Sequence, residues 1–277
     1  MAAATLDQSD SISPGCLTDT SCWQLAAAQK RGSSHEAAGT DCEDAYRVAM
    51  LSPDLLVIAV ADGAGSAQYA EAGASTATQR GVAQLCAALD QADGDLDDTV
   101  LEDMMREAMT AALAAVQAEA AGLQVNARDL ATTLILVVAK KEFVAVAQIG
   151  DGATVISDDA GKIISLTVPP VGEYINESTF LTSADALLTA QVKIRRGRAT
   201  RIAAFSDGLQ MLCLKWPEYQ PHEAFFMPLF DFVATTIDEL QAANDLAKFL
   251  SSARVSELTN DDLTLVLAAL KDTDDGS

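Results

Sequence analysis

The sequence has few basic residues: 18 lysines and arginines stand against 40 aspartates and glutamates, and the formal net charge is −22. A surface of this sign repels the phosphates of nucleic acids and of anionic membranes, so we expect neither as a partner. Histidine occurs only at positions 35 and 222, and the five cysteines include no Cys-x-x-Cys pair. Because zinc sites are usually built from clusters of histidine and cysteine, we do not expect a zinc enzyme.

Long apolar runs are also absent, and none approaches the ~20 residues needed to span a bilayer. The N-terminus does not place a basic region before an apolar one, as a secretory signal would. An odd number of cysteines without regular spacing is typical of thiols in a reducing compartment, so we expect a cytoplasmic location. With 277 residues, 49% of them hydrophobic, the chain is long enough to bury a substantial core.

The sequence predicts one domain with short polar ends. Residues 1–18 are small and polar and predict a flexible leader, and residues 272–277 form an acidic tail. No long linker rich in proline, glycine and serine interrupts the residues between these ends. We therefore predict a single domain over residues 19–271.

Short apolar runs separated by turn residues predict a series of strands. The expected strands are Trp23–Gln29, Ala45–Leu51, Leu55–Ala61, Thr132–Ala139, Phe143–Ile149, Thr154–Ser157, Ile163–Val168, Ile202–Phe205 and Leu263–Leu270. The expected helices are Ala70–Leu89, Thr99–Ala121, Leu209–Lys215 and Ile237–Ser252. This order favours a mixed α/β domain with mainly antiparallel sheets and helices outside. The less regular segment Val168–Arg201 is expected to form a loop or subdomain over a site.

Four aspartates, Asp62, Asp151, Asp207 and Asp261, lie where an apolar strand begins or ends. Taken singly, an Asp-Gly after a strand is an ordinary turn dipeptide. Four such residues on one rim of a sheet would bring carboxylates close together, and their mutual repulsion would raise their pKa values. Hard cations such as Mg²⁺ and Mn²⁺ prefer carboxylate and carbonyl oxygens and would remove that cost. The pattern therefore favours a divalent-cation site.

The order of these motifs gives the chain a family resemblance from about Gly32 to Leu267. The motifs are Glu43-Asp44, Asp62-Gly63, Thr132-Thr133 followed by Gly150-Asp151-Gly152, Ser206-Asp207-Gly208, and Asp261-Asp262 before the last strand. In this order they resemble the PP2C-type metal-dependent serine/threonine phosphatases, and in particular bacterial members. The resemblance implies a four-layer α+β sandwich of two mainly antiparallel sheets flanked by helices. It also implies hydrolysis of phosphoserine and phosphothreonine in protein substrates, which would be targets of a cognate kinase.

The resemblance further implies a centre of two Mn²⁺ or Mg²⁺ ions, with a third, weaker ion near Asp151. Asp62, Asp207 and Asp261 would be the catalytic ligands, with Asp62 bridging both metals and the carbonyl of Gly63 binding one. The acidic pair would complete the set: Glu43 through water, and Asp44 as a ligand or a supporting group. A water activated by both metals would attack phosphorus in line.

The sequence departs from the best-known members of that family at three positions. Gly39 stands where they have a phosphate-binding arginine, Ala64 where they have a histidine thought to act as a general acid, and Met211 where they have a further acid. Phosphate could be bound instead by Lys30, Arg31 or His35. His35 could equally be an exposed loop residue.

Basic residues gather in one place, at Arg195, Arg196, Arg198 and Arg201. They would either balance nearby acids in a solvated loop or dock the substrate beside the metals, with Arg196 as the candidate contact. Two other functions stay open beside the protein phosphatase: a non-catalytic binding or regulatory module on the same fold, and a phosphatase acting on a small phosphoester.

Overall fold

The computed structural model describes residues 21–92, 94–170 and 179–271 of the chain. The predicted leader and the acidic tail lie outside these residues. None of the described helices is both long enough and apolar enough to cross a membrane.

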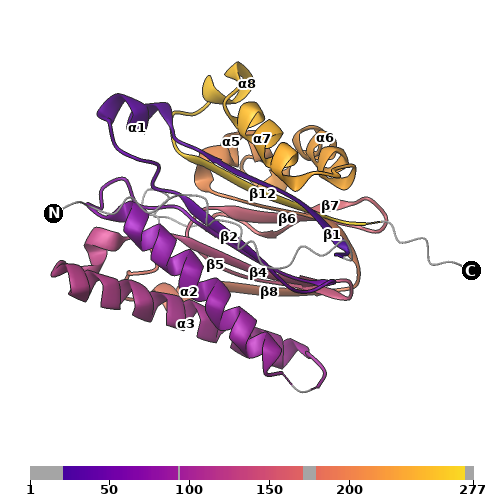
Figure 1. Cartoon of the computed structure of the whole chain (residues 1–277), viewed down its shortest axis with the longest axis horizontal. Helices are drawn as coiled ribbons and strands as arrows, with labels where there is room; N and C mark the ends of the chain where they lie inside the picture. Colours follow the sequence, from indigo (N-terminus) through magenta and orange to yellow (C-terminus); the bar gives the residue numbers. More distant parts are fainter. Residues whose placement is uncertain (1–20, 93, 171–178, 272–277) are drawn as a thin grey trace, which may run out of the picture.

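Two antiparallel sheets of five strands each lie face to face at the centre of the molecule (Figure 1). The first sheet has the order β1 (Trp23–Lys30), β12 (Leu263–Leu270), β9 (Ala199–Phe205), β6 (Ala153–Asp158) and β7 (Ile163–Thr167). The second has the order β2 (Ala45–Ser52), β3 (Leu55–Ala61), β4 (Leu134–Lys140), β5 (Phe143–Ile149) and β8 (Gln191–Arg196). The facing sides interlock through buried apolar residues such as Trp23, Ile58, Val137, Ile202 and Val266.

Helices cover the outer face of each sheet (Figure 1). Helices α2 (Ala70–Asp90) and α3 (Asp98–Leu123) pack on the second sheet, and α6 (Glu223–Ala234) and α7 (Glu239–Leu250) pack on the first. Shorter elements complete the described chain: α1 (Ser33–Ala38), η2 (Ala127–Leu130), α4 (Ala186–Thr189), η3 (Asp207–Leu209), α5 (Gln210–Cys213), β10 (Leu214–Lys215), β11 (Gln220–Pro221) and α8 (Ala253–Ser256). The helix–sheet–sheet–helix arrangement confirms the predicted four-layer α+β sandwich.

The apolar pattern explains why the longest helix lies where it does. Helix α3 is capped by Asp97, the residue before it, whose side chain accepts a hydrogen bond from the backbone N–H of Val100. Its buried face contains Leu101, Met105 and Met109, which are at most 1% exposed. Met105 and Met109 therefore fill the core, and Met104 packs against it partly buried.

Three parts of the chain that differ from the predicted elements are informative. The segment expected to be irregular contains β8, which pairs with β5, and the first residues of β9. The alternation in Gln191–Arg196 is that of a half-exposed edge strand, which is easily taken for a charged loop. Helix α6 was not predicted, because Pro228 interrupts a run of aromatic residues that has no clear polar face. The predicted helix Leu209–Lys215 is helical only to Cys213 and ends in β10.

Strand register places the acidic motifs at one edge of the sandwich. Ala45 pairs with Ala61, so the residues just before β2 and just after β3 lie side by side. Ile149 pairs with Leu134, which puts the end of β5 beside the start of β4. Phe205 at the end of β9 pairs with both Leu265 and Ala153. The same edge therefore receives all of the predicted acidic motifs.

Candidate active site

Three aspartates from separate loops meet at this edge. Asp62 follows β3, Asp151 lies between β5 and β6, and Asp207 begins η3 after β9. Each offers a carboxylate oxygen, and these oxygens all lie within 4.8 Å of one another. The three residues are half-buried, so the cluster opens to solvent while its carboxylates are partly dehydrated. This is an arrangement suited to a hard divalent cation.

The electrostatics of the cluster agree with that fit. Burial raises the pKa of Asp62 well above its ordinary value, and the charges of Asp44 and Asp207 raise it further. Burial also raises the pKa of Asp207 to about 6, and Asp151 and Asp261 add to that rise. One oxygen of Asp207, Oδ1, is buried without a hydrogen-bond partner. A cation at this position would compensate both the repulsion and the unpaired oxygen.

A fourth acid, Asp44, is buried beneath the cluster and is 3% exposed. Its Oδ2 accepts hydrogen bonds from Ser206 Oγ at 2.8 Å and from Thr264 Oγ1 at 2.7 Å. Burial raises its pKa to about 7 against the opposing effect of these two donors. Its other oxygen, Oδ1, is buried without a partner. Asp44 therefore joins three motifs of the site and leaves one oxygen for a further positive charge.

Two threonines hold the Asp62-Gly63 turn in place. The Asp62 N–H donates to Thr133 Oγ1 at 3.0 Å, and Thr132 Oγ1 donates to the Asp62 carbonyl at 2.9 Å. The Gly63 N–H donates to the Glu43 carbonyl at 3.1 Å. A Cβ on Gly63 would lie 2.7 Å from that carbonyl oxygen, so only glycine permits this close approach.

The other predicted acids lie around this centre. The Glu43 side chain is 16% exposed, and burial raises its pKa. Asp261 is exposed, and its Oδ1 accepts a hydrogen bond from the Asp262 N–H at 2.9 Å. Its charge acts on Asp62 and Asp207, but it is not one of the three residues that meet within 4.8 Å.

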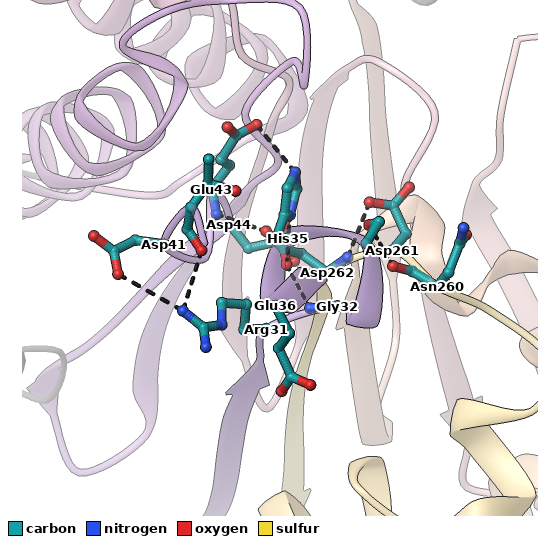
Figure 2. Close-up of polar contacts among 12 residues, drawn as sticks. Arg31, Gly32, His35, Glu36, Asp41, Glu43, Asp44, Asn260, Asp261 and Asp262 are labelled. Atoms are coloured by element: carbon teal, nitrogen blue, oxygen red, sulfur yellow. Dashed lines mark hydrogen bonds and ion pairs between the residues drawn. The ribbon is translucent and has the colours of Figure 1, made fainter. Parts of the chain in front are cut away.

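Two of the candidate phosphate-binding residues, Arg31 and Lys30, contact neighbouring groups of the protein. Arg31 turns towards the loop ahead of β2, where Nη1 donates to the Thr40 carbonyl at 3.1 Å and lies 4.0 Å from Asp41 Oδ1 (Figure 2). Lys30 forms an ion pair with Glu36. These contacts occupy both cations at the surface beside the acids.

Arg196 does not lie at the acidic edge. It pairs with Phe143 at the start of β5, six residues before Ile149, which is about 20 Å at the rise of an extended strand. Its Nη2 donates to the Leu96 carbonyl at 2.6 Å, and its Nε lies 2.6 Å from Asp98 Oδ1. The expectation that Arg196 contacts substrate beside the metals is therefore corrected: this residue ties β8 to the start of α3.

His35 lies on α1 with its side chain 18% exposed, so it is not an exposed loop residue. Nδ1 lies 2.9 Å from Asp262 Oδ1, and Nε2 lies 3.7 Å from Glu43 Oε2 (Figure 2). The contact with Asp262 raises the pKa of the imidazole, with smaller effects from Glu43 and Asp261, against the lowering effect of burial.

Several residues that shape the site escape sequence reasoning. Gln148 is 1% exposed, and its Nε2 donates to the carbonyls of Gly150 and Gly152, which fixes the loop that carries Asp151. Gln210 Nε2 donates to the Asp151 carbonyl at 2.6 Å. A glutamine within an apolar strand, as Gln148 is, is the one signal that could have drawn attention to this support.

The geometry agrees with what comparison with known proteins shows. Residues 31–251 match the family model described as protein phosphatase 2C. The chain therefore belongs to the protein phosphatase 2C family, whose members are hydrolases.

Among individual proteins, the chain is similar to serine/threonine-protein phosphatase 3 of Escherichia coli (strain K12). The two are 36% identical over 252 residues, which are 89% of this chain and 98% of that protein. Solved structures share the fold at lower identity. Stp1 of Staphylococcus aureus matches with a TM-score of 0.60 and 15% identity over 89% of this chain and 94% of that one. The catalytic domain of PstP in complex with two manganese ions matches with a TM-score of 0.55 and 21% identity over 90% and 99%.

Proposed function

We propose that this protein hydrolyses phosphoserine and phosphothreonine in protein substrates at a centre of two Mn²⁺ or Mg²⁺ ions. The observation that carries the proposal is the convergence of Asp62, Asp151 and Asp207 within 4.8 Å. Family membership supports it, and so does the relative of the same fold that was solved with two manganese ions. Membership and the retained acids also favour catalysis over a purely binding role.

In this proposal Asp62, Asp207 and Asp261 would hold the two ions, with the Gly63 carbonyl and Glu43 completing their surroundings, and Asp151 would serve a third, weaker ion. When bound, such ions activate water near neutral pH and offset charge on the phosphoryl oxygens. The chain's own part is to place the carboxylates before the substrate arrives. Thr132 does this by a hydrogen bond to the turn that carries Asp62, and Ser206 and Thr264 by hydrogen bonds to the Asp44 carboxylate.

The serine or threonine oxygen that leaves the phosphate needs a proton. Ala64 stands where the best-known members of the family have a histidine. Ala64 is 6% exposed and carries no proton to give. We propose that a water molecule protonates the leaving oxygen.

The proposal is tested by phosphate release from a phosphothreonine peptide with Mn²⁺, with Mg²⁺ and with chelator. We expect activity only with metal, and a loss of at least about 10²-fold in Asp62→Asn and Asp207→Asn. Arg196→Ala is the control, because Arg196 on β8 pairs with Phe143, at the end of β5 away from the acidic cluster. Full activity in both aspartate variants would refute the site assignment.

The choice of substrate needs its own experiment. The E. coli relative is named a serine/threonine-protein phosphatase, which favours phosphoproteins over small phosphoesters. A panel that pairs phosphopeptides with small esters separates the two, because good turnover of small esters alone would support the second version. The targets of a cognate kinase and a cytoplasmic location belong to the same proposal.

A further inference from the structure

The side chain of Asp262 is 3% exposed and accepts hydrogen bonds from two separate segments of the backbone. Its Oδ1 accepts a hydrogen bond from the Gly32 N–H at 2.6 Å, and its Oδ2 accepts one from the Glu43 N–H at 2.6 Å. The side chain of Asp262 is therefore committed to the backbone of two segments, and it is not offered to a cation at the centre.

The short helix α1 is pressed against the loop before β12. Ser34 donates from both its N–H and its Oγ to the Asn260 carbonyl, at 3.0 and 2.5 Å. A Cβ on Gly32 would lie 2.5 Å from that same carbonyl oxygen, so the close approach requires glycine here. These contacts fix the helix, and with it the position of His35.

The imidazole of His35 stands between Asp262 and Glu43 (Figure 2). Nδ1 faces Asp262 Oδ1 at 2.9 Å, and Nε2 faces Glu43 Oε2 at 3.7 Å. Glu43 Oε2 is buried and has no hydrogen-bond partner of its own. Among the described residues, no other histidine, lysine or arginine lies within ion-pairing distance of Glu43. The histidine is thus placed to restrain this carboxylate.

We propose that His35 is a positioning residue: through its Nε2 side it restrains the Glu43 carboxylate and so strengthens the binding of the metal that Glu43 serves. The inference rests on the proposed function. It differs from the expectation that His35 grips phosphate, because both ring nitrogens face carboxylates. The hydrogen-bond partners of groups that surround a metal typically change its affinity 10- to 100-fold when they are removed.

Two conservative variants separate this role from a merely structural one. Asparagine places its amide nitrogen near the position of Nδ1 and keeps the contact with Asp262, whereas glutamine places its nitrogen near Nε2 and keeps the contact with Glu43. We expect His35→Gln to bind Mn²⁺ within about threefold of the wild type, and His35→Asn to lose about as much affinity as His35→Ala. If the role is only to hold α1 against Asp262, the order of Gln and Asn is reversed, and the proposal is overturned.

The measurement is calorimetric titration of the purified full chain with Mn²⁺, with unfolding in chelator as a check that each variant folds. A double-mutant cycle with Glu43→Gln tests the coupling. We expect His35→Ala to weaken one Mn²⁺ site about 10- to 100-fold in the wild-type background and to have little further effect in Glu43→Gln. His222→Ala is the control, because that exposed imidazole lies against the Leu212 carbonyl.

The outcomes also separate this inference from the proposed function. Mn²⁺ binding that depends on Asp62 but is unchanged in His35→Ala would overturn the inference alone, and so would equal effects of His35→Ala in both backgrounds. A wild-type chain that binds neither Mn²⁺ nor Mg²⁺ in the same titration would overturn the proposed function, and the inference with it.

Discussion

The stability of the metal-free protein should fall as the pH rises from 5 to 8. In the folded chain the pKa of Asp44 is raised from 3.8 to about 7 and that of Asp207 from 3.8 to about 6, chiefly by burial. A carboxyl group whose pKa is higher in the folded state binds more protons there than in the unfolded state. The stability from that proton is therefore complete below about pH 4 and is lost as the pH rises through the folded pKa. The raised pKa of His35 acts in the same direction.

The size of the effect follows from the same values. From pH 5 to about pH 7, the Asp44 carboxyl is protonated in the folded state and ionised in the unfolded state. At about 1.4 kcal/mol per pH unit, these two units lower the free energy of unfolding by about 3 kcal/mol. Asp207 adds about 1 kcal/mol over the shorter range from pH 5 to 6. Asp62 and Glu43, whose pKa values burial also raises, contribute to the slope in the same direction.

Urea unfolding of metal-stripped protein at several pH values measures this slope. Trp23 is 1% exposed and gives an internal fluorescence signal for the loss of the core. Asp44→Asn keeps an oxygen that can accept from Ser206 and Thr264 but has no proton to lose, so its slope should be flatter. Saturating Mn²⁺ should restore stability at pH 8, by about 2.7 kcal/mol for each site filled at a concentration 100 times its Kd. A wild-type slope that is flat or rising, or equal slopes in both proteins, would refute the reasoning.

Three substitutions test other parts of the structure. Gly63→Ala would place a Cβ 2.7 Å from the Glu43 carbonyl and should destabilise the fold by about 1–3 kcal/mol in urea unfolding, whereas unchanged stability and activity would show that the turn yields freely. Ser206→Ala removes a donor to buried Asp44 and should cost about 1–3 kcal/mol and lower kcat, and a neutral result in both assays would mean that the bond is not needed. Arg196→Ala breaks an exposed ion pair and should cost less than about 1 kcal/mol with unchanged kcat/KM, whereas a large drop in kcat/KM would show that Arg196 contacts the substrate after all.

Much of the fold follows from apolar runs that are continuous in the sequence. Strand β3 begins and ends where its run of buried residues begins and ends, and β5 and β12 do likewise. Residues 191–196 form an edge strand whose alternating polar residues resemble a loop, and only pairing with β5 reveals it. Local composition carries no information about that partner, so this strand could not be predicted.

In the site too, some residues could be predicted from local sequence and others could not. The aspartates at strand ends could be picked out because each follows or precedes a strand, and the structure brings Asp62, Asp151 and Asp207 together. What supports them could not be picked out: the hydrogen bond from Thr264 to Asp44 joins residues 220 positions apart, and no local pattern marks it. The same holds for Arg196, whose partner Asp98 lies 98 positions away. The cluster of arginines in the sequence suggested that Arg196 contacts the substrate. The register of β8 against β5 instead places Arg196 beside Phe143.

The pairing of β1 with β12 has a consequence for how the protein is made. Strand β12 lies between β1 and β9, and the residues at its start hold Gly32, Glu43 and Asp44. A growing polypeptide has none of these contacts until nearly the whole described fold has been translated. Because domains fold as units and distant pairings close late, we expect the hydrogen bonds of Asp262 and Thr264 with the earlier acidic motifs to form only when β12 docks.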